Sequence, residues 1–237
     1  HLAGTDSQRS SDLEQASRQG AALLACLRGG WGAARLLERP LPLPARWLLG
    51  FSDVTSLLWA QLARGHGGAI HGPLLTTLAA EPAWSQQRLH DLLFGLPLPP
   101  LQGRGCRSGQ AEGPLLVANL TVATHLLGTP HLPPLQGAIL VLEDVGEAPY
   151  RLERLLTHWR LCGALQQLAG IGFGHSSHPG SGVGLTNIRE RLRLLYGDKA
   201  SLRTVSPASG GSVVSIEIPY RSRTGPSDRK STRLNSS

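Results

Sequence analysis

The sequence is poor in aromatic residues, has no methionine and contains no long apolar run. Aromatic side chains make up 5% of the 237 residues, so Leu and Ala supply most of the 41% that are hydrophobic. No apolar run reaches the roughly 20 residues needed to cross a bilayer, which argues against a membrane-spanning helix. The hydrophobic fraction still suffices for one or two domains with a buried core.

The start of the chain also lacks the features of a natural beginning. Residues 1–6 contain neither a methionine nor a basic segment followed by an apolar one. We therefore expect the N-terminus of the natural protein to precede His1.

Cysteine is scarce and widely spaced. Cys26, Cys106 and Cys162 form an odd set without a close pair, which argues against a disulfide scaffold and against a zinc site. We expect free thiols in a reducing compartment. The sequence predicts no metal and no cofactor.

Lysine is absent from the first 174 residues, and its distribution locates the positive charge. Residues 1–174 hold 13 Arg and 12 acidic residues, a net charge of +1, whereas residues 175–237 hold 8 Arg, 2 Lys and 4 acidic residues, a net charge of +6. The total of +7 therefore describes the end of the chain. Because no basic face with base-reading elements is visible, we predict no nucleic-acid partner.

Short apolar runs alternate with amphipathic segments in the first part of the chain. We expect a helix at residues 6–19, a strand at 21–27 and a glycine-rich turn at 28–32. A strand, a tight turn and a helix come next over residues 46–63, and another strand over 69–73. This alternation predicts an α/β domain with a mostly parallel sheet and flanking helices.

A stretch rich in Pro and Gly separates this domain from a second one. We interpret residues 97–113 as a linker between an N-terminal domain, residues 1–96, and the start of a truncated second domain, residues 114–174. The elements expected in the second domain are two strands and a helix, at residues 115–120, 137–142 and 150–168.

Ser52 lies where a predicted strand ends and a predicted helix begins. Such a turn can hold a nucleophile, because free amides at the start of a helix can stabilise an oxyanion. The same position suits a plain helix N-cap, the simpler interpretation from spacing alone. Gly50-x-Ser52 lacks the second glycine of the α/β-hydrolase turn, so that family is disfavoured.

Several blocks of sequence occur in a fixed order. They are Leu-Ala-Gly-Thr-Asp at residues 2–6, Arg-Gly-Gly-Trp-Gly at 28–32, Gly-Phe-Ser-Asp-Val-Thr at 50–55, His-Gly-Pro at 71–73, Leu-Gly-Thr-Pro at 127–130 and Leu-Glu-Asp-Val-Gly-Glu at 142–147. Together they resemble the LD-carboxypeptidase family of serine peptidases over about residues 2–173. Several blocks in one order are more specific than any single motif.

The resemblance implies a Ser–His–Glu triad that removes the terminal D-amino acid, at an L,D bond, from murein tetrapeptides in peptidoglycan recycling. Ser52 would be the nucleophile and Glu143 the acid that orients the histidine, with Glu147 as a weaker candidate. The backbone amides of Asp53 and Gly30 would donate to the oxyanion. The enzyme would be cytoplasmic, would act on a small murein peptide away from membranes, and would form a homodimer when intact.

Other charged residues near these motifs keep two interpretations. Arg28 and Arg35 lie close to the glycine turn, where either could receive the substrate carboxylate or form a structural ion pair. Asp53 also suits the first turn of a helix, and Glu143 could be a solvated strand end. His71 does not match the base that the resemblance implies, and beside Gly-Pro we expect it to be structural.

The resemblance ends near Gly174. His175 and His178 come too early for the implied base, so we predict that the triad histidine is missing and that the chain is inactive or nearly so. Gly-Ser-Gly-Val-Gly-Leu at 180–185 and Ile-Glu-Ile-Pro at 216–219 resemble the end of a sensor histidine kinase ATPase domain over about residues 180–220. We interpret residues 175–227 as a fragment of such a domain that lacks its nucleotide-binding half. Residues 228–237 match a translated sequencing adapter, which predicts a chimeric reading frame with an unrelated α+β tail.

Three alternatives to a murein carboxypeptidase stay open. Microcin-immunity peptidases share the implied fold and triad, and the tail alone suggests a two-component sensor histidine kinase. The main part could also be a peptide-binding remnant without catalysis. A serine-reactive probe separates this last case from an enzyme, because labelling at Ser52 that Ser52→Ala abolishes requires a nucleophile.

Overall fold

The computed structural model describes most of the first 174 residues and two strands beyond them. His175, His178, most of the segment that resembles a histidine kinase and residues 228–237 lie outside the described residues. The described residues are 2–41, 43, 45–103, 109–144, 147–174, 201–205 and 213–217.

Three short parallel strands form the first sheet. β1 (Leu23–Ala25), β2 (Trp47–Gly50) and β3 (Ala69–His71) pair side by side in that order. Their mostly aliphatic sequences suit parallel strands that other elements cover. Helix α1 (Asp6–Arg18) precedes β1, and α2 (Thr55–Ala63) follows β2. The predicted alternation of strands and helices is confirmed.

A second parallel sheet has the same arrangement. β4 (Leu115–Asn119), β5 (Ile139–Glu143) and β6 (Gly170–Phe173) pair in that order. Helix α4 (Leu120–Leu126) follows β4 directly, and α5 (Pro149–Leu161) connects β5 to β6. The carboxyl ends of β4 and β5 therefore lie at the same edge of the sheet, as parallel pairing requires.

Two predicted boundaries in this part differ from the structure. The predicted strand ran one residue too far, because the Asn119 side chain accepts a backbone hydrogen bond at 3.1 Å and so caps the start of α4. The predicted helix at residues 150–168 ends at Leu161. Gly163, with φ of 78°, turns the chain there before the short 3-10 segment η4 (Leu165–Gln167).

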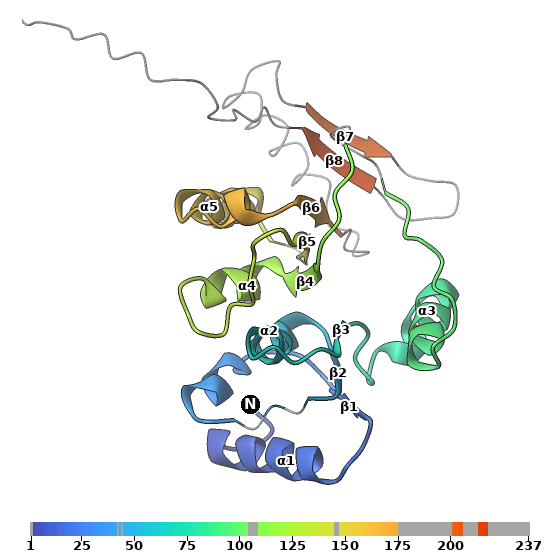
Figure 1. Cartoon of the computed structure of the whole chain (residues 1–237), viewed down its shortest axis with the longest axis vertical. Coiled ribbons are helices and arrows are strands. Elements are labelled where there is room, and N and C mark those ends of the chain that lie inside the picture. Colours follow the sequence, from blue (N-terminus) through green and yellow to red (C-terminus); the bar gives the residue numbers. More distant parts are fainter. Residues whose placement is uncertain are drawn as a thin grey trace, which may run out of the picture.

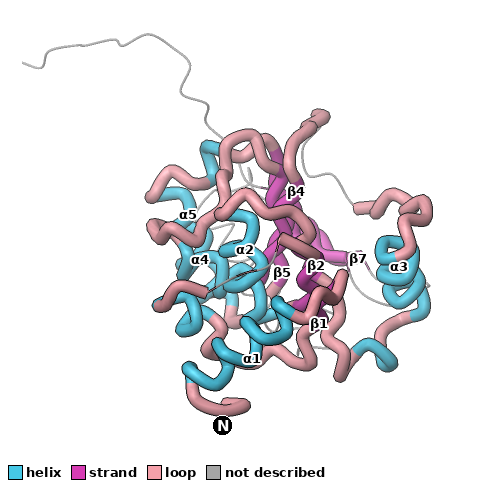
Figure 2. The backbone as a smooth tube through the Cα atoms, turned by 60° about the horizontal axis from the view of Figure 1, so that its bottom comes forward, coloured by secondary structure: helices cyan, strands magenta, loops and turns pink. Residues whose placement is uncertain are grey.

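The remaining elements are mostly short. Helix α3 (Ala83–Leu93) is not among the elements expected from the sequence, and Figure 2 shows it across the strands from α2, α4 and α5. Within the described residues, no helix combines the length and the apolar character that crossing a membrane requires. The remaining bounds are η1 (Ala34–Glu38), η2 (Ser52–Val54), η3 (Leu78–Ala80) and an antiparallel pair of β7 (Ser201–Val205) and β8 (Val213–Glu217).

Helices α2 and α4 join the two sheets through one hydrophobic core (Figure 1). Trp59 of α2 and Trp159 of α5 are fully buried, with their rings edge to face and 6.3 Å apart. The Trp59 indole donates to the Val117 carbonyl at 3.0 Å, and the Trp159 indole donates to Thr124 Oγ1 at 2.8 Å. Both buried indoles are thus satisfied, and this packing sets how the two sheets face each other.

Candidate active site

Ser52 is held in the left-handed conformation directly after β2. Its φ is 63°, the one positive φ among the described residues other than glycine. Residues with side chains adopt this region rarely and at a cost, and they cluster at functional turns. The N-cap interpretation is wrong, because Phe51 caps η2 and Val54 caps α2, both without a side-chain hydrogen bond.

Glycines on both sides let the chain pack closely around Ser52. A β-carbon on Gly29 would lie 3.1 Å from the Ser52 β-carbon and 3.4 Å from its Oγ. A β-carbon on Gly50 would collide with Val54 Cγ1 at 2.3 Å, so the turn closes only with glycine there. Gly30, the residue after Gly29, is exposed, and its amide meets no acceptor among the described residues, which leaves that donor available.

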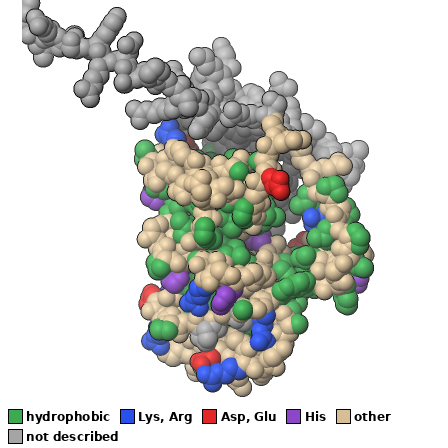
Figure 3. Space-filling model, in the orientation of Figure 1, with side chains coloured by type: hydrophobic (Ala, Val, Ile, Leu, Met, Phe, Trp, Pro, Cys, Tyr) green, Lys and Arg blue, Asp and Glu red, His purple; other side chains and the backbone are tan. Residues whose placement is uncertain are grey.

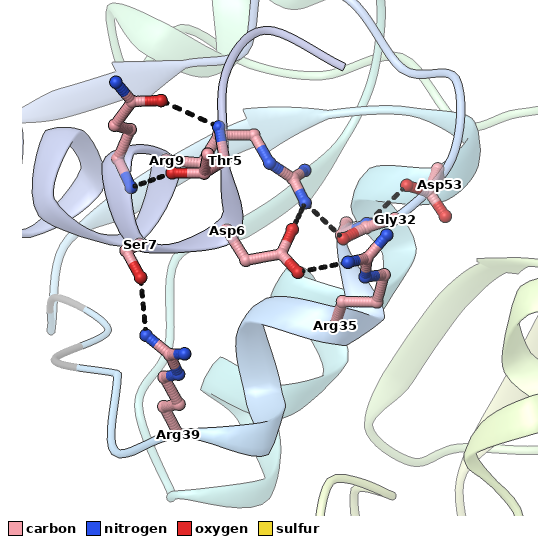
Figure 4. A network of polar contacts seen from close by, with 10 residues as sticks. Thr5, Asp6, Ser7, Arg9, Gly32, Arg35, Arg39 and Asp53 are labelled. Carbon is pink, nitrogen blue, oxygen red and sulfur yellow. Dashed lines mark hydrogen bonds and ion pairs between the residues drawn. The ribbon is translucent and has the colours of Figure 1, made fainter. Parts of the chain in front are cut away.

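Asp53 ties the glycine turn to the segment that carries Ser52. Its Oδ2 accepts a hydrogen bond from the Ala33 amide at 2.7 Å (Figure 4). The Asp53 side chain thus joins two segments 20 positions apart in sequence. The simpler interpretation, an acidic residue that only favours the first turn of a helix, does not account for this contact.

A cluster around Asp6 holds Gly32, the last residue of the glycine turn (Figure 4). The Asp6 carboxylate pairs with Arg9 and with Arg35, each at 2.5 Å, and Arg9 also donates to the Gly32 carbonyl at 3.1 Å. The Arg9 hydrogen bond, together with the charge of Arg35, holds the pKa of Asp6 below its ordinary value. Arg35 is therefore a structural ion-pair residue. Arg28 is exposed and forms no ion pair within the described part of the chain.

Glu143 lies where the carboxyl ends of the two sheets meet. It ends β5, and its side chain is 14% exposed, so the interpretation as a solvated strand end is wrong. Its Oε1 lies 3.7 Å from Nε2 of His71, which ends β3. The backbone N–H of its strand neighbour Asn119 donates to Thr55 Oγ1 at 3.1 Å. Thr55 lies three residues after Ser52. These contacts link the carboxylate to the turn that carries the serine.

The neighbouring acidic residues already have partners. The Glu147 carboxylate pairs with Arg151 at 2.7 Å, and Asp144 accepts a hydrogen bond from Thr121 at 3.0 Å. Glu143 is therefore the better candidate for orienting a base. In the part of the chain that the structure describes, no three His, Cys, Asp or Glu side chains gather as a metal site would require.

The sequence does not reveal the contact between His71 and Glu143. It predicts a structural role for His71, and the residue type alone does not identify a partner. The available signal is positional, because each residue ends a parallel strand and active sites of α/β proteins lie at the carboxyl ends of strands. The two ends lie on different sheets, however, and packing between the parts that carry these sheets, including that of α2 on α4, brings them together.

Exposed apolar side chains gather on another part of the surface. Figure 3 shows hydrophobic side chains over α3 and the segment after it. Trp84, Phe94 and Leu96 of this region are 67%, 71% and 46% exposed. No residue of the Ser52 turn belongs to this apolar surface.

Comparisons with known proteins find similar sequences and similar folds. Family models described as the LD-carboxypeptidase N-terminal and C-terminal domains match residues 1–72 and 112–203. A Synechocystis sp. protein provisionally named a carboxypeptidase is 50% identical over 182 residues, 75% of this chain and 60% of that protein. A murein tetrapeptide carboxypeptidase of Pseudomonas aeruginosa is 40% identical over 196 residues, 73% of this chain and 62% of that protein.

Solved structures give the same architecture. The muramoyltetrapeptide carboxypeptidase from Oxalobacter formigenes superposes with a TM-score of 0.63 at 26% identity, over 81% of this chain and 72% of that chain. The microcin C7 self-immunity protein superposes with a TM-score of 0.59 at 20% identity, over 72% and 62%, which indicates a shared fold alone. The present chain spans about three fifths of the length of the two curated relatives. The C-terminal match reaches residue 203, past the predicted end of the resemblance at Gly174.

Proposed function

Because the chain belongs to the LD-carboxypeptidase family, we propose that Ser52 is the nucleophile of a serine carboxypeptidase acting on murein tetrapeptides. The observation that carries the proposal is the left-handed Ser52, held between β2 and α2 with the glycine turn in contact. Ser52 Oγ attacks the carbonyl carbon of the terminal L,D peptide bond. The terminal D-amino acid then leaves as an amine, and water hydrolyses the resulting acyl-enzyme.

The other roles follow from position. Glu143 accepts the N–H of the histidine base and fixes its orientation, as the acid of a triad does. The amides of Asp53 and Gly30 donate to the oxyanion that forms on the attacked carbonyl. Arg28, exposed beside the glycine turn, is the candidate for receiving the substrate carboxylate. The proposal uses no metal and no cofactor.

No described residue is assigned as the histidine base of this mechanism. The prediction that the triad histidine is missing concerns His175, His178 and the residues after them, which lie outside the described ranges. It stays a prediction, and with it the expectation of weak turnover. Without a base, Ser52 retains only the contributions of binding and of the oxyanion donors.

A murein peptide is favoured over a microcin as substrate. The P. aeruginosa relative that carries the murein name is 40% identical, whereas the microcin self-immunity protein is 20% identical. The alternative of a sensor histidine kinase depends on residues 175–227 alone. We further propose a cytoplasmic location, which suits the free thiols of Cys26 and Cys162, and a homodimer, which light scattering after gel filtration would test.

Labelling with a fluorophosphonate probe tests the nucleophile. We expect the probe to modify Ser52, as peptide mass spectrometry would detect, and we expect Ser52→Ala to remain unlabelled. Ser11→Ala, at an exposed serine of α1, serves as the matched control and should label like the wild type. Incubation with a murein tetrapeptide and chiral chromatography would measure any release of the terminal D-amino acid. Labelling of Ser52→Ala as strong as that of the wild type would contradict the proposal.

A further inference from the structure

His71 lies beside the carboxylate that the proposed mechanism uses to orient the base, and we propose that His71 is a positioning residue for Glu143. The inference deepens the proposed function and rests on it for its catalytic consequence. In the proposed arrangement His71 Nε2–H donates to Glu143 Oε1 and so fixes the carboxylate. The second carboxylate oxygen is then free to face the base.

Burial and missing partners support this pairing. The side chains of His71 and Glu143 are only 9% and 14% exposed. Both ring nitrogens of His71 and Oε1 of Glu143 are buried, and none has a hydrogen-bond partner within the described residues. Buried polar groups are almost always satisfied. The 3.7 Å between Nε2 and Oε1 is slightly longer than a hydrogen bond, so a small rotation of either side chain completes the bond.

The segment that presents Ser52 also fixes the imidazole. The His71 ring packs edge to face on Phe51, with 5.4 Å between ring centroids. In the sheet, His71 pairs with Gly50, and the Gly72 amide donates to the Gly50 carbonyl at 3.0 Å. His71 thus bridges the strand that leads to the nucleophile and the strand that carries the acid. The bridge therefore lies between the two sheet edges at the site.

A role as the base itself fits the geometry less well. A base must accept the hydroxyl proton of the serine at hydrogen-bond distance. The structure shows no hydrogen bond between His71 and Ser52 in its described residues, and His71 Nε2 is the nitrogen that lies beside Glu143. The contacts of His71 therefore indicate positioning of the acid.

A double-mutant cycle on the full chain tests the contact. His71→Phe keeps the ring packing on Phe51 and removes the donor, and Glu143→Ala removes the acceptor. Each single variant lowers the ratio of folded to unfolded protein by some factor. If the two side chains interact, the double variant will keep a ratio about 10-fold higher than the product of the two factors predicts. Urea unfolding at neutral pH measures these ratios. Losses that multiply within error would overturn the proposal, whether or not Ser52 reacts.

Probe labelling of Ser52 then separates positioning from other roles. Positioning affects labelling only where a base is present; for such a chain, His71→Gln keeps an N–H at the place of Nε2 and should label within about 3-fold of the wild type, whereas His71→Phe should label about 10-fold more slowly. Equal losses of labelling rate in both variants would indicate that His71 is itself the base. No loss in either variant would exclude a role of His71 in catalysis. Both results would overturn the inference. A wild-type chain that never labels while the cycle shows coupling would remove the proposed activity of this chain, as a missing base predicts, and would leave the His71–Glu143 pair supported.

Discussion

The Asp53 carboxylate and the Ala33 amide are joined by a 2.7 Å hydrogen bond, and this contact holds the glycine turn against the proposed nucleophile. Directly before Ala33, the Gly32 carbonyl accepts from Arg9. The two neighbouring positions are thus fixed by opposite kinds of group, a carboxylate and a guanidinium. The turn beside Ser52 is therefore preorganised, as an oxyanion site requires.

Removing the Asp53 carboxylate should loosen the glycine turn beside Ser52. We expect Asp53→Ala to lower the free energy of unfolding by about 1–2 kcal/mol, because the Ala33 amide loses a charged acceptor. Labelling of Ser52 should slow as well. Asp53→Asn keeps an acceptor oxygen and should lie between Asp53→Ala and the wild type in both urea unfolding and labelling. If Asp53→Ala labels at the wild-type rate, the carboxylate does not hold the turn in place.

A methyl group at Gly29 should push the glycine turn away from Ser52. Its β-carbon would lie 3.1 Å from the Ser52 β-carbon and 3.3 Å from the Phe51 carbonyl, both tighter than ordinary contacts. We expect Gly29→Ala to slow probe labelling at least about 10-fold and to cost about 1–3 kcal/mol of stability, as overpacking does. Gly67→Ala is the matched control, because a β-carbon there meets nothing within 4 Å. Equal labelling of both variants would show that the turn has room to move.

Ser52 itself should be a strained position. Its φ of 63° suits glycine better than serine, so Ser52→Gly relieves a backbone cost that Ser52→Ala keeps. We expect Ser52→Gly to exceed Ser52→Ala in the free energy of unfolding by about 1 kcal/mol, and both to lose labelling. Parallel urea unfolding curves of the two variants measure the difference. A more stable alanine variant would mean that the left-handed conformation is absent in solution.

Local sequence patterns predicted the immediate surroundings of Ser52 well. Gly50 followed by Ser52 and Asp53 indicated a tight turn between strand and helix, and the structure has that turn. The pattern could not reveal what Asp53 binds, because Ala33 lies 20 positions away and its amide carries no sequence signal. The choice between a structural and a substrate-binding Arg35 was likewise decided by the position of Asp6.

Contacts between the two sheets were beyond the reach of the sequence. His71 and Glu143 end strands of different sheets, and their approach depends on how Trp59 and Trp159 pack between the helices. Periodicity predicts which residues are buried, but it does not predict which buried residues meet. Helix α3 was not predicted either, although its sequence is no less amphipathic than that of α1, which was predicted.

Cys26 should resist alkylation in the folded protein, and its titration should lower the free energy of unfolding at alkaline pH. Burial raises the pKa of the Cys26 thiol from 9.0 to about 11, so at pH 8 its thiolate fraction is roughly 100-fold below that of an ordinary thiol. We expect iodoacetamide to modify the exposed Cys162 first, as timed peptide mapping would detect.

The same shift fixes the sign of the pH dependence. A folded-state pKa above the unfolded one means that the stabilising contribution of Cys26 is complete below pH 9 and is lost as the pH rises towards 11. Between these pH values the wild type should lose up to about 2 kcal/mol more stability than Cys26→Ala, in which this thiol does not titrate. Urea unfolding of both proteins from pH 8 to 11 gives the comparison. Parallel pH profiles, or alkylation of Cys26 as fast as of Cys162, would mean that the thiol is open to water.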